Sequence, residues 1–289
     1  MLRYSFTPVE HCEMCASRNF RQLGMRLNRS QGMRPREADG IAVSVKQCRD
    51  CDLIFADPQP MPNQLSDHYD MPPEDYWGRT PAWTPEYFAT EIAAAKRLLP
   101  FADGMTALDI GAGQGLAMQS LIHAGFDVWG IEPTETFYQY ASPKMKPGRL
   151  MHAAVETAEF DAESFDFITF GAVLEHLYSP SLALGRAMGW LKPGGIIQAE
   201  VPNARWLIAK LVNGYFRLRG TNYVTHISPM HPPFHLYEFT DRSFRRFEVA
   251  ERVWSVCEIP YFPRLLHSPL RWLMDRTRTG MQLTVYLRK

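Results

Sequence analysis

The stretch ALDIGAGQG, residues 107–115, constrains the fold of this chain more than any other feature. Apolar residues lead to Asp109, and glycines then occupy every second position: Gly111, Gly113 and Gly115. Glycine tolerates positive φ and lets a ligand approach the backbone closely, so the pattern predicts a ligand-holding turn between a strand and a helix. The helix that follows would direct unpaired N–H groups at a polar ligand.

The chemistry of this turn separates two nucleotide ligands. A dinucleotide site typically reads G-x-G-x-x-G, and this turn is one residue shorter. A carboxylate at Asp109 would repel a pyrophosphate but attract an ammonium group. Glu132 ends the next predicted strand, where a carboxylate can accept hydrogen bonds from both hydroxyls of a ribose. A ribose joined to a positive or zwitterionic group describes S-adenosylmethionine better than NAD.

Strand-like and helix-like stretches alternate beyond residue 85. This order predicts an α/β protein with parallel βαβ units in a doubly wound sheet. A helix followed by a strand is also expected over 241–259. The other strand-like stretches are 106–110, 126–131, 165–172, 195–201 and 281–289, and the helix-like ones are 86–100, 115–125, 134–141 and 181–191.

Four segments resemble, in order, the motifs of class I S-adenosylmethionine-dependent methyltransferases. They are LDIGAGQG, the acid Glu132, FDFITFGAVLEHL and LKPGGIIQAEVPN. The resemblance covers roughly residues 85–289 and implies a seven-stranded Rossmann-like sheet whose last strand is antiparallel. It also implies site roles: Asp109 and the glycines near the methionine part, Glu132 on the ribose, Val155 and Glu156 beside the adenine, and Gly171 facing the methyl donor. An alternative is a Rossmann-like fold that uses the glycines only for tight turns.

Two C-x-x-C pairs lie in the first part of the chain. Four thiolates suit a tetrahedral zinc ion, and four protein ligands close the coordination sphere, so the sequence predicts a structural zinc held by Cys12, Cys15, Cys48 and Cys51. Strands are expected at 41–48 and 52–56, which would let the long intervening loop fold back. The alternative is two chance pairs of buried thiols.

The cysteine block and the segments that follow it are similar to bacterial methyltransferases with an N-terminal zinc module, often associated with sugar or polysaccharide biosynthesis. That group includes C-methyltransferases of nucleotide-linked deoxysugars, which carry a further C-terminal domain with no counterpart here. The resemblance therefore favours O-methylation of a sugar or glycan hydroxyl. It implies a zinc module and linker over 1–80 and a methyltransferase domain over 81–289 with an inserted lid at about 203–237. It also makes Tyr76 a candidate lid residue over the cofactor.

Histidines near the expected carboxyl ends of the strands are candidate bases. Transfer to a hydroxyl requires removal of its proton, a task that suits histidine near neutral pH. His235, in a segment FHLYEFT that resembles one common in these methyltransferases, is the leading candidate, followed by His176 and His231. Phe234 stands where the sugar C-methyltransferases often have an acid. A structural role for His235 is the alternative.

Charge and hydropathy limit the partners of the chain. It has 31 basic and 31 acidic residues, which gives no surplus for nucleic-acid binding. The sequence shows no apolar run long enough for a membrane span and no signal peptide, so a cytoplasmic protein with a small-molecule or glycan substrate is expected. The stretches 203–220 and 261–278 are rich in aromatic and basic residues. Four roles stay open for them: a substrate cover, a dimer surface, a peripheral membrane contact or a packed insertion.

Three other functions stay open on the sequence. The first is carbon methylation of a nucleotide-linked keto-deoxysugar. The second is a non-catalytic module that binds zinc and a nucleotide, against which the intact glycines, Asp109 and Glu132 speak. The third is an NAD-dependent oxidoreductase, which the glycine spacing disfavours.

Overall fold

A seven-stranded mixed sheet forms the centre of the computed structural model, which describes residues 4–27, 42–63, 82–231, 233–256, 259–260 and 262–289. Its strands are arranged in the order β12-β13-β10-β9-β6-β7-β8. The five strands from β10 to β8 are parallel, and β13 is antiparallel to both β10 and β12. The predicted sheet, with its antiparallel last strand, is confirmed. The strands are β6 (Thr106–Ile110), β7 (Asp127–Glu132), β8 (Leu150–His152), β9 (Phe165–Gly171), β10 (Leu191–Pro202), β12 (Glu248–Ser255) and β13 (Gln282–Arg288).

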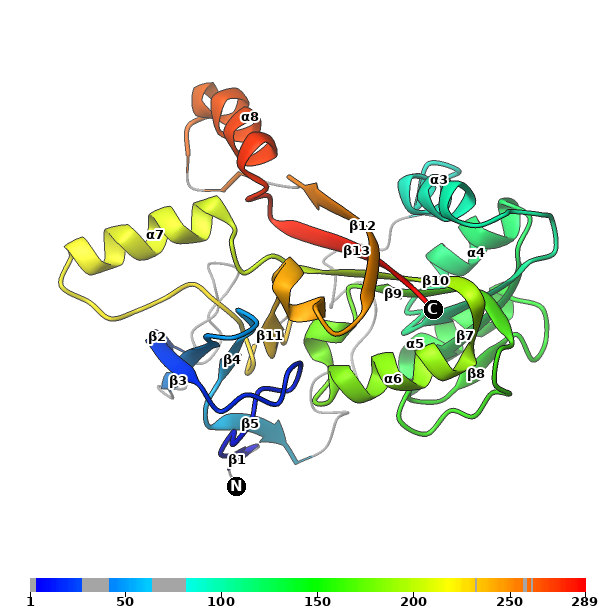
Figure 1. Cartoon of the computed structure of the whole chain (residues 1–289), viewed down its shortest axis with the longest axis horizontal. Coiled ribbons are helices and arrows are strands. Elements are labelled where there is room, and N and C mark those ends of the chain that lie inside the picture. The colour runs from blue at the N-terminus through cyan, green and yellow to red at the C-terminus, as the bar shows by residue number, and fades with distance from the viewer. Residues whose placement is uncertain (1–3, 28–41, 64–81, 232, 257–258, 261) are drawn as a thin grey trace.

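Helices cover both faces of this sheet (Figure 1). Successive strand residues point to opposite faces, so Ala107 joins one apolar cluster and Leu108 joins another. The first cluster includes α3 (Ala89–Leu98), α4 (Leu116–His123) and α5 (Glu135–Ala141), and the second includes α6 (Pro180–Trp190). The doubly wound arrangement expected from the alternating pattern is therefore present. A 3-10 turn, η1 (Ser142–Lys144), extends α5.

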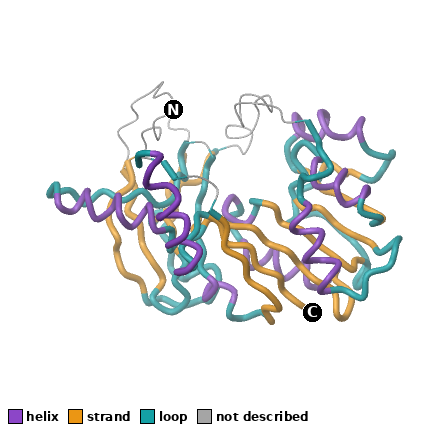
Figure 2. Tube along the Cα trace, turned by 90° about the horizontal axis from the view of Figure 1, so that it is seen from above, coloured by secondary structure: helices purple, strands orange, loops and turns teal. Residues whose placement is uncertain are grey.

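The N-terminal residues form a separate set of antiparallel strands (Figure 2). A two-stranded ribbon consists of β1 (Tyr4–Thr7) and β5 (Gln59–Pro62). The second sheet contains β2 (Phe20–Leu27), β3 (Ala42–Cys48) and β4 (Ile54–Ala56). The strands expected around 41–48 and 52–56 are β3 and β4.

The segment after β10 completes this N-terminal sheet. It starts with α7 (Leu207–Leu218) and ends with β11 (Tyr237–Glu238), which pairs antiparallel with β4. At the opposite edge, the backbone of Met25 in β2 exchanges hydrogen bonds with Asn222 and Val224. Both edges of the sheet are thus covered by one insertion, and an apolar cluster fills the space between them: Val43, Val45, Ile54, Ala56, Ala204, Val224, Ile227 and Met230. The lid role expected for about 203–237 stays a prediction.

Side chains of residues 240–246, which precede β12, donate hydrogen bonds to the backbone of the two C-x-x-C loops, here called the cysteine loops. Thr240 and Ser243 donate hydroxyl hydrogen bonds to the carbonyl oxygen of Cys51 at 3.3 and 3.1 Å. Arg246 donates to the carbonyl oxygen of Cys15 at 2.7 Å. The four cysteines that were predicted to bind zinc also belong to the apolar cluster on the α6 face of the central sheet. The N-terminal strands and the central sheet therefore share one core.

The helix predicted at the start of 241–259 is wrong. A short 3-10 turn, η3 (Asp241–Phe244), takes its place and β12 follows. Thr240 and Ser243 cap each other across this turn while both hydroxyls bond the cysteine loop, so the backbone is held by contacts distant in sequence. The stretch 261–278 contains η4 (Arg264–Leu266) and α8 (His267–Thr277). None of the helices in the described part of the chain has the length and hydropathy of a membrane span.

Candidate methyl-donor and acceptor site

The three glycines form the turn between β6 and α4. All of them have positive φ, at 72° for Gly111, 53° for Gly113 and 75° for Gly115. A Cβ on Gly111 would also lie 2.7 Å from a methyl group of Val173. Only glycine fits these dihedrals without strain, as the sequence pattern indicated.

Asp109 lies just before this turn and is only 3% exposed. Its Oδ2 atom has no hydrogen-bond partner among the described residues. Burial, together with the nearby charge of Glu132, raises the pKa of Asp109 to about 8. A buried carboxylate without a partner is costly, and a cationic ligand group at this position would relieve that cost. The ammonium and sulfonium charges of S-adenosylmethionine fit this environment.

Glu132 joins the end of β7 to the glycine turn. Its Oε2 accepts the backbone N–H of Gly113 at 2.8 Å, and its Oε1 accepts that of Thr134 at 2.8 Å. Burial is the main cause that raises the pKa of Glu132. Each carboxylate oxygen has a second lone pair, so the side chain can still accept hydroxyl hydrogen bonds. Two backbone contacts fix the carboxylate orientation, which suits recognition of a ribose.

The expected adenine side is a turn that follows β8. The N–H of Ala153 donates to the backbone oxygen of Glu132 at 3.1 Å, which keeps this turn next to the ribose position. Val155 is buried in the core cluster, whereas Glu156 is exposed. The structure thus fixes the start of this turn on Glu132 and gives Val155 and Glu156 different surroundings.

Gly171 ends β9 and is paired in register with Glu200 of β10. A Cβ at Gly171 would meet no atom within 4 Å, so the space in front of this residue is open. Burial and the charge of Glu91 raise the pKa of Glu200 to about 7. Sequence reasoning missed Glu200, although its place near the carboxyl end of a predicted strand was the signal that could have identified it.

Glu175, His176 and His235 form a cluster beyond the end of β9. The first two belong to a 3-10 turn, η2 (Leu174–His176), and His235 immediately precedes Leu236, whose N–H donates to the backbone oxygen of Glu175 at 2.8 Å. The Nε2 atoms of His235 and His176 lie 3.8 and 4.0 Å from Oε1 of Glu175. The two imidazole rings meet edge to face at 5.0 Å. The structure therefore brings two of the three predicted histidines together with Glu175, an acid of the same segment as His176.

The electrostatics of this cluster favour neutral side chains. Burial raises the pKa of Glu175 to about 8, and its Oε2 has no hydrogen-bond partner among the described residues. Burial also lowers the pKa of His235 well below its usual value, and the nearby His176 and His231 lower it further. A lowered pKa favours the unprotonated imidazole, which is the state required of a proton acceptor.

His231, the third candidate, contacts the N-terminal sheet. Its Nε2 lies 3.5 Å from a guanidinium nitrogen of Arg26 in β2. Burial and the charge of Arg26 lower the pKa of His231 to about 4. This contact favours a structural role for His231 over a catalytic one. Tyr76, the candidate lid residue, lies outside the described residues.

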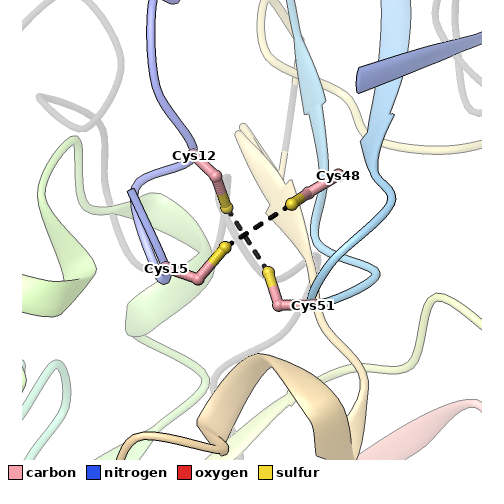
Figure 3. A group of neighbouring side chains, drawn as sticks. All are labelled: Cys12, Cys15, Cys48 and Cys51. Carbon is pink, nitrogen blue, oxygen red and sulfur yellow. Dashed lines mark hydrogen bonds between the residues drawn. The ribbon is translucent and has the colours of Figure 1, made fainter. Parts of the chain in front are cut away.

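The four N-terminal cysteines converge on one point (Figure 3). All are buried and none forms a disulfide. Sγ of Cys12 lies 3.4 Å from Sγ of Cys51, Sγ of Cys15 lies 3.5 Å from Sγ of Cys48, and all four sulfur atoms lie within 4.8 Å of one another. Tetrahedral thiolates about 2.3 Å from a zinc ion would be separated by similar distances. The donor set fits zinc, and it leaves no ligand position for a substrate.

Comparisons with known proteins agree with this geometry. Residues 108–199 match a family model described as a methyltransferase domain. The chain is 30% identical over 128 residues to a ubiquinone biosynthesis O-methyltransferase of Bradyrhizobium sp. (strain ORS 278), covering 43% of this chain and 51% of the relative. It is 32% identical over 125 residues to the protein of the same name from Paramagnetospirillum magneticum (strain ATCC 700264 / AMB-1), covering 42% and 50%. The chain thus spans about half the length of these curated relatives.

A solved structure supports the fold. It is a chain of the complex between the Haloferax volcanii Trm112 methyltransferase activator and a methyltransferase, and it superposes with a TM-score of 0.51. The alignment covers 78% of this chain and 97% of that chain at 20% identity. The central sheet and its helices therefore form an α/β methyltransferase fold. The glycine turn lies within residues 108–199, the segment that the family model matches.

Proposed function

We propose that this chain, whose residues 108–199 carry a methyltransferase domain, transfers the methyl group of S-adenosylmethionine to an acceptor hydroxyl. The observation that supports this most directly is the pair of buried carboxylates at the glycine turn. Asp109 presents an oxygen without a partner among the described residues, and Glu132 is held in position by two backbone N–H groups. A cation next to a ribose is the ligand chemistry that this pair complements.

The roles of the other donor-site residues follow from this placement. Asp109 and the three glycines receive the methionine part, Glu132 receives the ribose, and the turn with Val155 and Glu156 lies beside the adenine. Gly171 leaves room for the reacting methyl group because the space in front of it is open. S-adenosylmethionine supplies an electrophilic methyl carbon on a sulfonium sulfur.

His235 is the proposed acceptor of the hydroxyl proton. As the acceptor oxygen bonds to the methyl carbon and the carbon–sulfur bond breaks, the hydroxyl proton passes to Nε2 of His235. Oε1 of Glu175 lies 3.8 Å from that nitrogen, and the positive charge that the ring gains would lower the raised pKa of Glu175. His176 packs against His235 and orients it. His231 takes no part in this scheme.

Two classes of hydroxyl acceptor are supported by different observations. The resemblance of the cysteine module to sugar-associated methyltransferases supports a sugar or glycan hydroxyl. The names of the relatives support a hydroxyl of a ubiquinone precursor. In both cases the zinc ion on Cys12, Cys15, Cys48 and Cys51 is structural.

Calorimetric titration with S-adenosylhomocysteine, with NAD as the control, tests the donor site. Saturable binding of the first compound and no binding of NAD is expected. Binding of NAD alone would overturn the proposal, and binding of neither would favour a non-catalytic module. Product analysis then separates methylation on oxygen from methylation on the carbon of a keto-sugar.

The variant His235→Ala tests the proton acceptor. Its turnover should fall by about 100-fold or more while affinity for S-adenosylhomocysteine stays within about twofold, because a general base acts on the acceptor and not on the donor. The exposed His123, at the far end of α4, provides the matched control His123→Ala. Unchanged turnover in His235→Ala would remove the base assignment.

A further inference from the structure

The helices α7 and α8 lie at one end of the molecule (Figures 1 and 2), and both carry exposed apolar side chains. On α7, Leu211, Tyr215 and Leu218 are 44%, 57% and 89% exposed, and their spacing places them on one side of the helix. On η4 and α8, the exposed apolar residues are Leu265, Leu266, Trp272 and Leu273. We refer to these seven side chains as the α7–α8 surface.

The two helices are held together by a small apolar cluster of their own. Ile208 of α7, Met274 of α8 and Ile259 are buried in it, apart from the clusters that line the central sheet. The buried side of each helix therefore already has a partner. The seven exposed residues take no part in this packing. Apolar residues that gather on a protein surface indicate an interaction site.

Basic residues predominate on the same two helices and in the residues next to them. The exposed basic residues are Lys210, Arg217, Arg219, Arg264, Arg271, Arg276 and Arg278. The only acid in residues 203–220 and 262–278 is Asp275. The whole chain has a net charge of zero, so this positive region is a local feature of the fold.

From these observations we propose that the α7–α8 surface docks on an anionic lipid bilayer. Leucines and aromatic residues can enter the boundary between headgroups and acyl chains, while arginines and lysine remain at the level of the phosphates. A second copy of this chain suits the surface less well, because a two-fold contact would bring two sets of like charges together. This proposal does not depend on methyl transfer, since vesicle binding is measured without a substrate.

Co-sedimentation with vesicles tests the proposal on the full chain. Vesicles of phosphatidylcholine and phosphatidylglycerol in equal parts should bind the protein at least about tenfold better than pure phosphatidylcholine vesicles, and about 0.5 M NaCl should abolish most of the difference. Each arginine replaced by glutamine should weaken binding by about fivefold.

The double variant Leu218→Glu with Trp272→Glu should weaken vesicle binding by at least about tenfold. Leu182 of α6 is 52% exposed and lies outside this surface, so Leu182→Glu is the matched control and should bind like the parent. Unchanged melting temperature and S-adenosylhomocysteine affinity would show that the double variant is folded.

Three results would overturn the proposal. One is equal binding to neutral and anionic vesicles. Another is binding that the double variant leaves unchanged. The third is a stable dimer in light scattering that the double variant dissociates, because the surface would then join two copies of the chain.

Discussion

At the scale of single residues, the carboxylates of this site differ in what surrounds them. Glu132 accepts two backbone hydrogen bonds, whereas Asp109 and Glu175 each have a buried oxygen without a partner among the described residues. The first arrangement holds a side chain in one orientation. The second leaves a buried carboxylate oxygen, which is stabilised when a cation or a proton donor binds next to it. Substitutions at these positions should therefore change different measurable quantities.

Replacement of Glu132 by glutamine should weaken binding of S-adenosylhomocysteine by about 10- to 100-fold, because one charge-assisted acceptor of the ribose is lost. Calorimetric titration measures the effect. The exposed Glu135, three residues later at the start of α5, gives the control Glu135→Gln, which should bind like the parent. Parent-like affinity in Glu132→Gln would contradict the ribose assignment.

Gly171→Ala should leave the fold intact but reduce donor affinity by about tenfold, because the new methyl group would occupy space reserved for the ligand. A Cβ at Gly185 of α6 would also meet no atom within 4 Å, so Gly185→Ala is the matched control. Melting temperatures and calorimetry distinguish the two. Equal affinities in both variants would mean that the donor does not reach Gly171.

Glu175→Gln should stabilise the protein increasingly as pH rises from about 5 to 8. Burial raises the pKa of Glu175 from 4.5 to about 8, so between these values the folded chain retains a proton that the unfolded chain has released. The free energy of unfolding of the parent therefore falls with rising pH through this range, and glutamine removes that contribution.

Thermal unfolding at several pH values measures this effect. The difference in melting temperature between Glu175→Gln and the parent should grow by at least about 3 °C between about pH 5 and 8. The exposed Glu159 supplies the control Glu159→Gln, which should show no such trend. A constant difference would mean that Glu175 has an ordinary pKa.

At the scale of elements, the shortest of the described strands connects parts of the chain that are distant in sequence. β11 contains two residues, yet it pairs with β4 one residue after His235 and shortly before Thr240, which donates a hydrogen bond to the carbonyl oxygen of Cys51. The proposed zinc site and the proposed acceptor site are thus joined by a few consecutive residues.

A chelator that removes zinc from the proposed four-cysteine site should therefore loosen β11. Hydrogen exchange at the amides of Tyr237 and Glu238 should become at least about tenfold faster, while amides of β6 and β7 keep their protection. Mass spectrometry of the native protein should show one zinc per chain before treatment. Unchanged exchange at β11 after complete loss of the metal would show that the cysteine loops do not hold this strand.

Periodicity and glycine spacing predicted the elements around the donor site, because a strand, its turn and the next helix are determined by neighbouring residues. The antiparallel last strand was implied by the family resemblance, and the structure confirms it. The pairing of β11 with β4 could not be predicted, since two residues carry no periodic pattern and the partner is distant in sequence. The same reason explains why a helix was wrongly expected at the start of 241–259, where distant hydrogen bonds fix a 3-10 turn.

At the scale of the whole molecule, the boundary expected near residue 80 does not separate two independent cores. Four cysteines share an apolar cluster with strands of the central sheet, and both edges of the N-terminal sheet are covered by residues 222–238. The N-terminal strands therefore act as part of the structure that surrounds the acceptor site.

Deletion of residues 1–63 should accordingly give an insoluble or unfolded product. It would expose the apolar side chains of Val224, Ile227 and Met230 and leave β11 without a partner. Solubility and thermal unfolding of the 64–289 fragment test this, with a chain that lacks only residues 1–3 as the control. A soluble fragment that unfolds cooperatively and binds S-adenosylhomocysteine would show that the two parts fold separately.

The pairing of β4 with β11 also has a consequence for synthesis on the ribosome. β4 ends at Ala56, but its partner begins only at Tyr237, so its outer edge stays uncovered for about 10 to 35 s at typical elongation rates. During that interval the nascent chain presents a short apolar strand edge to other chains. We expect chaperones that bind nascent polypeptides to protect this edge until β11 has been synthesised.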